Sequence, residues 1–115
     1  MKVLFFGNRR TISSYQDIIK STINNFFDRH HFKAKGEISI YFVSSRRIHS
    51  LNKKYRQIDQ PTDVLSFPLW ENISKMPKTG KINLGDIFIC LKFVSKDELK
   101  GVVEHSLNHL VGKHH

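Results

Sequence analysis

The sequence is poor in cysteine, in long apolar runs and in acidic residues. Cys90 is the only cysteine among 115 residues, so no disulfide can form within the chain and the fold needs no oxidising compartment. The longest apolar runs, such as residues 3–6, are far shorter than the roughly 20 residues that cross a bilayer. The start of the chain also lacks the apolar stretch and cleavage site of a secretory signal. We therefore expect a cytoplasmic protein with no membrane partner.

The scarcity of acidic residues makes the chain strongly basic. Nineteen Lys and Arg against ten Asp and Glu give a formal net charge of +9. Residues 1–57 contain twelve basic and three acidic side chains, whereas residues 58–115 contain seven of each. A basic surface binds polyanions because the neutralised phosphates release condensed counterions. The charge favours a nucleic-acid partner; a charge that only keeps the protein in solution is the alternative.

Apolar periodicity predicts a single α+β domain over residues 1–115. Strands are expected at residues 2–6, 36–43, 64–68 and 84–91. Three helices are expected: one capped by Ser13 or Ser14 and running to residue 27, one from Ser44 or Ser45 to Gln60-Pro61, and one over residues 95–110. Residues 69–83 are expected to form a polar loop, either a binding element or ordinary surface. The whole predicts a four-stranded mixed sheet packed with helices.

The sequence predicts the buried face of the second helix and both ends of the third helix. In the second helix, Tyr55 is expected to point inward together with the aliphatic residues one and two turns before it. In the third helix, Ser95 followed by Glu98 fits a capping box. Gly112 fits a left-handed stop after the last turn. These features fix where the third helix begins and ends.

Histidines are concentrated at the end of the chain, where four of the seven fall within the last eleven residues. His105 and His109 are four residues apart, so on a helix they project from one face a single turn apart. Gly112 can reverse the chain and bring His115 back toward this pair. Three imidazoles with a fourth position open form the catalytic arrangement of zinc. We therefore predict one Zn²⁺ per chain held by His105, His109 and His115; nickel or cobalt, histidines placed by chance and a purification tag are the alternatives.

This spacing overlaps the zinc-protease pattern His-Glu-x-x-His-x-x-Gly-x-x-His but lacks its general base. In those proteases a glutamate follows the first histidine, whereas Ser106 follows His105 here. Glu104 precedes His105 and points about 100° away around a helix, so it cannot replace that base. A metal site without a carboxylate base suits a polarised phosphate better than a peptide bond, and proteolysis is disfavoured.

Two stretches of the sequence resemble the signatures of the YbeY-type endoribonucleases, the rRNA maturation factors. Residues 51–56 read Leu-Asn-Lys-Lys-Tyr-Arg and lead into residues 61–68, Pro-Thr-Asp-Val-Leu-Ser-Phe-Pro. Residues 105–115 are similar to the family's His-Gly-x-Leu-His-Leu-x-Gly-Tyr-Asp-His. The strand between these signatures, with Gly-Asp-Ile at residues 85–87, also resembles the family. The chain is thus identified as a member of this family.

The resemblance implies a metal-dependent endoribonuclease specific for single-stranded RNA. It implies maturation of the 3′ end of 16S rRNA and ribosome quality control, with the small ribosomal subunit as a partner. His105, His109 and His115 would hold zinc. Arg56 would contact the substrate phosphate through its guanidinium group, so Arg56 and His105 are the expected catalytic residues.

The sequence departs from the family pattern in three places. The segment between residue 87 and the first signature histidine is about ten residues shorter than in family members. In the histidine signature, the family's glycine, leucine, tyrosine and aspartate are replaced by Ser106, Asn108, Lys113 and His114. The expected third ligand, His115, is the last residue given, and His114 can compete for its position. These departures leave a second hypothesis open: a ribosome-associated RNA-binding module with reduced catalysis.

Overall fold

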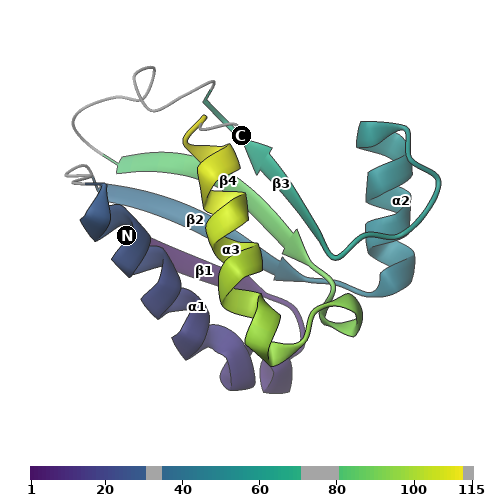
Figure 1. Ribbon diagram of the computed structural model, residues 1–115, viewed down its shortest axis with the longest axis horizontal. Helices are drawn as coiled ribbons and strands as arrows, with labels where there is room; N and C mark the ends of the chain where they lie inside the picture. Colours follow the sequence, from purple (N-terminus) through teal and green to yellow (C-terminus); the bar gives the residue numbers. More distant parts are fainter. Residues whose placement is uncertain (31–34, 71–80, 113–115) are drawn as a thin grey trace.

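The fold is built on a four-stranded mixed sheet, seen in a computed structural model that describes residues 1–30, 35–70 and 81–112 (Figure 1). The strands are β1 (Lys2–Phe6), β2 (Lys35–Phe42), β3 (Val64–Pro68) and β4 (Lys81–Ile89), in the spatial order β1-β2-β4-β3. The β1–β2 and β2–β4 pairs are parallel, whereas β3 runs antiparallel to β4 at the edge of the sheet. The predicted mixed sheet is confirmed.

Helices α1 (Arg9–Arg29) and α3 (Lys96–Leu110) lie side by side over one face of the sheet (Figure 1). Their apolar stripes and the inward residues of the strands form the main core. Its fully buried members include Ile19, Ile23, Ile38, Ile40, Ile87, Ile89, Leu99, Val103, Leu107 and Leu110. Helix α2 (Ser45–Arg56) packs near β3, where a smaller buried cluster comprises Ile48, Leu51, Leu65 and Cys90. A short 3-10 helix, η2 (Leu91–Phe93), connects β4 to α3.

The predicted start of the first helix was wrong by more than one turn. The side chain of Asn8 accepts hydrogen bonds from the backbone N–H groups of Arg10 at 2.9 Å and Thr11 at 3.3 Å. Because Asn8 satisfies these otherwise unpaired donors, α1 begins at Arg9 and not after a serine. Ser14 instead lies within the helix, where its hydroxyl donates to the carbonyl of Arg10 at 3.0 Å.

The second helix ends earlier than the Gln60-Pro61 boundary predicted from the sequence. It begins after Ser44, whose Oγ accepts from the N–H of Arg47 at 3.1 Å, and its last residue is Arg56. Gln57 then adopts a left-handed conformation with φ of 58°, which stops the helix before proline can. The inward placement of Tyr55 was also wrong, because this side chain is 52% exposed.

Strand β4 begins at Lys81 and ends at Ile89, so the predicted boundaries of 84 and 91 were both late. Most of the predicted loop over residues 69–83, namely residues 71–80, lies outside the described residues. A bulge lets Asn83 pair with Glu37 and Gly85 pair with Ile38, which leaves Leu84 as an extra residue in β4. Gly85 has φ of 139°, in the region that favours glycine.

The predicted ends of the third helix are confirmed. Ser95 Oγ accepts from the N–H of Glu98 at 3.3 Å, while the Glu98 carboxylate accepts from the N–H of Ser95 at 3.0 Å. Gly112 has φ of 77° and its N–H donates to the carbonyl of His109 at 3.2 Å. This end of α3 brings residues 105–109 close to the edge strand β3.

Candidate active site

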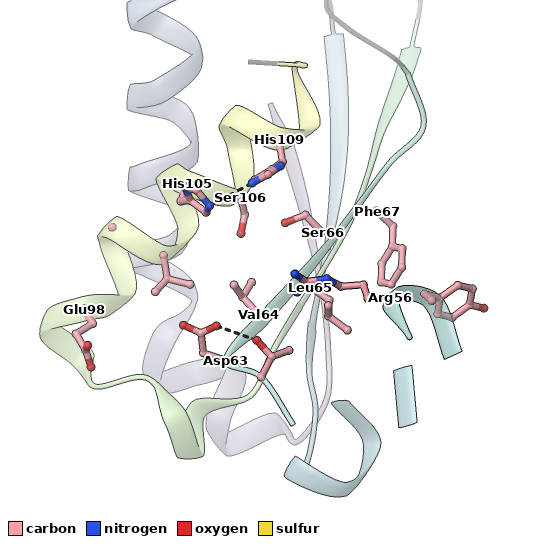
Figure 2. A pocket seen from close by; sticks show the side chains of 14 residues that line it. Arg56, Asp63, Val64, Leu65, Ser66, Phe67, Glu98, His105, Ser106 and His109 are labelled. Atoms are coloured by element: carbon pink, nitrogen blue, oxygen red, sulfur yellow. Dashed lines mark hydrogen bonds between the residues drawn. The ribbon is translucent and has the colours of Figure 1, made fainter. Parts of the chain in front are cut away.

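A pocket of about 920 Å³ lies between α3, strand β3 and the end of α2 (Figure 2). One wall is the side of α3 that carries Glu98, Val102, His105 and His109. The opposite wall is β3 with the residues just before it, and Tyr55 and Arg56 contribute from α2. Since β3 is the edge strand, side chains from both of its faces border the same space. The pocket is therefore lined by residues of both signature stretches, which are about 40 residues apart in the chain.

The two helical histidines of the predicted metal site converge within this pocket. The Nε2 atoms of His105 and His109 are 3.1 Å apart, and their rings lie at 78° to each other (Figure 2). Two nitrogens bound to one zinc ion in a tetrahedral site lie about 3.3–3.4 Å apart. Their separation and donor chemistry fit two corners of such a site, and the one-turn spacing places both rings on one face of α3.

The packing of α3 explains why these two rings reach the pocket. Leu107 and Leu110 are fully buried against the sheet, and the helix face beside this buried stripe carries His105 and His109 and borders the pocket. His105 is exposed and His109 is half-buried, which leaves both accessible to a ligand. His114 and His115 lie outside the described residues, and within the described chain no group of three His, Cys, Asp or Glu side chains could hold a metal ion.

Arg56 is the last residue of α2, and its guanidinium group points across β3 into the pocket (Figure 2). Two hydrogen bonds made by Asn52 stabilise the turn that follows Arg56. Buried Asn52 donates from Nδ2 to the carbonyl of Gln60 at 2.8 Å, and the N–H of Ile58 donates to the carbonyl of Asn52 at 3.3 Å. These bonds fix the path of the chain from Arg56 to β3. The structure therefore places Arg56 on the same pocket as the histidine pair.

Two serine hydroxyls point toward the same space from opposite walls (Figure 2). Ser66 lies on β3 and lines the pocket. Ser106 is fully buried, and its Oγ has no hydrogen-bond partner among the described residues. In the sequence, Ser106 stood out only because it replaces the glutamate of the zinc-protease pattern and the glycine of the family signature. Its position three residues after buried Val103 was the signal that it faces β3.

The carboxylates near the pocket differ in what they can do. Asp63 Oδ1 accepts a hydrogen bond from Thr62 Oγ1 at 3.2 Å, and both residues line the pocket. Glu98 has a pKa below its ordinary value because the backbone and side chain of Ser95 hydrogen-bond it at the helix cap. Glu104 pairs with Arg29 at 3.6 Å and is absent from the lining residues, as expected from its position on the helix.

This arrangement joins an imidazole pair, a guanidinium group and hydroxyls around one cavity, which is a set of groups suited to a phosphate ester. Residues 6–115 match the sequence profile of the family described as Endoribonuclease YbeY. The chain belongs to the YbeY endoribonuclease family. The family resemblance inferred from the two signatures is thus confirmed.

Individual YbeY relatives support the same assignment. The Endoribonuclease YbeY of Lachnospira eligens is 33% identical, with 88% of this chain and 76% of that protein covered. That of Shouchella clausii is 34% identical over 90% of this chain and 76% of its own length. A Thermotoga maritima protein solved in solution superposes with a TM-score of 0.58 at 25% identity, covering 96% of this chain and 72% of that one.

The described helices offer no membrane-spanning segment. In residues 1–30, 35–70 and 81–112, no helix combines the length and the apolarity needed to cross a bilayer.

Proposed function

We propose that this chain is a zinc-dependent endoribonuclease that cleaves single-stranded RNA in the pocket between α3 and β3. The observation that carries the proposal is the convergence of the His105 and His109 Nε2 atoms, 3.1 Å apart, in the pocket that Arg56 enters. Membership of the YbeY family supports the reaction, and the net charge of +9 supports a polyanionic substrate. Residues 1–115 would act as one domain.

In this proposal His105, His109 and His115 hold the metal, with His114 as the competing third ligand. A bound Zn²⁺ supplies a Lewis acid that polarises a phosphoryl oxygen and lowers the pKa of its water. Arg56 binds the scissile phosphate with two parallel N–H donors and stabilises the charge that develops on it. The hydroxyl of Ser66 is placed to hold a second phosphate oxygen.

Family membership supports a role in rRNA maturation. We propose maturation of the 3′ end of 16S rRNA and ribosome quality control in the cytoplasm, with the small ribosomal subunit as the partner. A single strand suits the pocket because its backbone is flexible and its bases are unpaired.

The proposal is tested by replacing His109→Ala and measuring both bound metal and RNA cleavage. We expect about one zinc per wild-type chain and a loss of cleavage of more than about 100-fold in the variant, because one ligand is gone. His30→Ala is the matched control: this histidine packs on the Phe26 ring at 4.3 Å, outside the pocket lining, and its loss should leave cleavage unchanged.

Cleavage by His109→Ala at the wild-type rate would overturn the assignment. The rival hypothesis of a reduced RNA-binding module predicts a different result. It requires RNA binding that survives a chelator and no cleavage at any metal concentration, so titration of zinc into the wild-type protein separates the two.

A further inference from the structure

A row of five aromatic rings crosses the face of the sheet opposite α1 and α3. The rings of Phe6, Tyr41 and Phe88 are stacked, with centroids 4.7 and 4.5 Å apart and interplanar angles of 14° and 9°. Phe67 meets Phe88 edge-on at 5.5 Å, and Tyr55 meets Phe67 edge-on at 5.2 Å. We call these five residues the aromatic row. It connects all four strands and the last turn of α2.

The sheet register explains the row. Phe6 pairs with Tyr41 between β1 and β2, and Tyr41 pairs with Phe88 between β2 and β4. Paired residues point to the same face, and the residues next to them along each strand, such as Phe5 and Ile40, pack into the main core instead. The aromatic row therefore lies on the face that α1 and α3 do not cover.

The aromatic row is open at both ends. Phe6 is 44% exposed and Tyr55 is 52% exposed, although both are large rings that could be buried in a core. Helix α2 reaches this face only near β3, and no other described helix lies over β1 and β2 on that side (Figure 1). Exposed aromatic groups in a continuous patch mark interaction surfaces.

The aromatic row is continuous with the pocket, and its surroundings favour RNA over an apolar partner. Tyr55 and Phe67 belong to the aromatic row and also line the pocket. Lys54 Nζ lies 5.2 Å from the centre of the Tyr55 ring, and Lys2 lies on the Phe6 face of β1. Strands β1 and β2 and helix α2 together contain seven Lys or Arg residues and one acidic residue, Glu37.

Acidic side chains beside the aromatic row indicate which part of an RNA strand would contact it. Asp86 pairs with Phe67 in the sheet, and Glu37 lies on the Tyr41 side of β2. Carboxylates repel phosphates but accept hydrogen bonds from the amino groups of bases. An RNA strand would therefore contact the aromatic row through its bases, with its phosphates toward solvent.

We propose that the aromatic row is a stacking surface for bases of the RNA strand that continues out of the pocket. The proposal rests on the proposed function, because it requires RNA in the pocket. Every base has a π-face, so such a surface holds a single strand without selecting its sequence. Four strands span about 14 Å, so RNA must extend several nucleotides beyond the pocket to reach Phe6.

The test is the length dependence of RNA affinity, measured by fluorescence anisotropy in the presence of a chelator so that no RNA is cut. The probes are labelled oligouridylates of 4 and 12 nucleotides. The double variant Phe6→Leu/Tyr41→Leu keeps apolar volume but removes two rings. We expect it to bind the 12-mer about tenfold more weakly than the wild type and the 4-mer equally well.

Two controls keep this result interpretable. Phe93→Leu removes a ring that is 43% exposed on η2, outside the aromatic row, and should leave both affinities unchanged. Circular dichroism of the double variant checks that it is folded; if it is not, the single Phe6→Leu variant must show the same selective loss. Unchanged 12-mer affinity in a folded variant overturns the proposal and makes a protein the better candidate for this face.

Failure of this inference and failure of the proposed function give different results. If the wild-type protein never cleaves RNA but its affinity for the 12-mer depends on the aromatic row, catalysis is refuted and the stacking surface is supported. A protein that cleaves RNA and binds both probes independently of the aromatic row refutes the stacking surface alone.

Discussion

Burial raises the pKa of the Asp86 carboxyl group, which lies on the sheet between its register partners Ser39 and Phe67. Its proton is therefore held more tightly in the folded chain than in the unfolded chain. The stability associated with this group is fully present below its unfolded pKa, near 3.8, and is lost as the pH rises through the folded pKa. At neutral pH the ionised carboxylate lowers the free energy of unfolding.

We predict that Asp86→Asn raises the free energy of unfolding at pH 7 by less than about 1 kcal/mol, because the group is partly exposed and solvent screens it. The gain should shrink at pH 3.5, where the Asp86 carboxyl of the folded chain is mostly protonated and neutral like the amide. Urea denaturation at the two pH values measures this. Asp59→Asn is the opposite control: hydrogen bonding from His49 and the charge of Lys53 lower the pKa of Asp59, so its replacement should destabilise at pH 7. A loss of stability in Asp86→Asn at pH 7 contradicts the prediction.

At the scale of elements, the turn between α2 and β3 depends on one buried amide. Asn52 is 2% exposed, and its Nδ2 donates to the carbonyl of Gln60 at 2.8 Å. We predict that Asn52→Ala lowers the free energy of unfolding by about 1–3 kcal/mol, because the Gln60 carbonyl loses its buried donor. RNA cleavage should also fall at temperatures where the variant is fully folded, since the turn positions Arg56.

Asn24 provides the matched control for that amide. Its Nδ2 donates to the carbonyl of Lys20 at 2.9 Å, but this hydrogen bond is exposed to solvent. Asn24→Ala should change the free energy of unfolding by no more than about 0.5 kcal/mol. Equal effects of the two substitutions in thermal and urea denaturation would show that the Asn52 bond does not hold the turn.

The helices and strands themselves were predictable, and their ends were predictable only where a local motif decides them. The capping box at Ser95 and the glycine stop at Gly112 are local, and both were predicted correctly. The left-handed turn at Gln57 was missed because this residue type rarely adopts positive φ without tertiary support. That support is the hydrogen bond from Asn52 to Gln60, which periodicity cannot reveal.

At the scale of the whole molecule, sequence reasoning found the histidine pair but not the surfaces around it. His105 and His109 meet because they lie one turn apart on one helix, a relation that spacing alone determines. Tyr55 was expected in the core because apolar spacing marks one helix face without saying where the neighbouring sheet ends. The exposed Tyr55 ring and the aromatic row arise from strand order and register, which become known only when the chain is folded.

One position, Gly85, links the sheet, the edge strand and α3. A Cβ placed there would lie 3.0 Å from Leu110 Cδ2 and would collide with the backbone carbonyl oxygen of Phe67. Its φ of 139° adds strain for any other residue. We predict that Gly85→Ala lowers the free energy of unfolding by more than about 2 kcal/mol, because β3 or α3 must move. Since both elements wall the pocket, RNA cleavage should fall as well.

Gly101→Ala is the control. A Cβ at this helical position meets nothing within 4 Å, so the substitution should raise the free energy of unfolding by up to about 1 kcal/mol. Urea denaturation of both variants decides, and a Gly85→Ala protein as stable as the wild type would show that the β3–β4 pairing does not depend on this close approach.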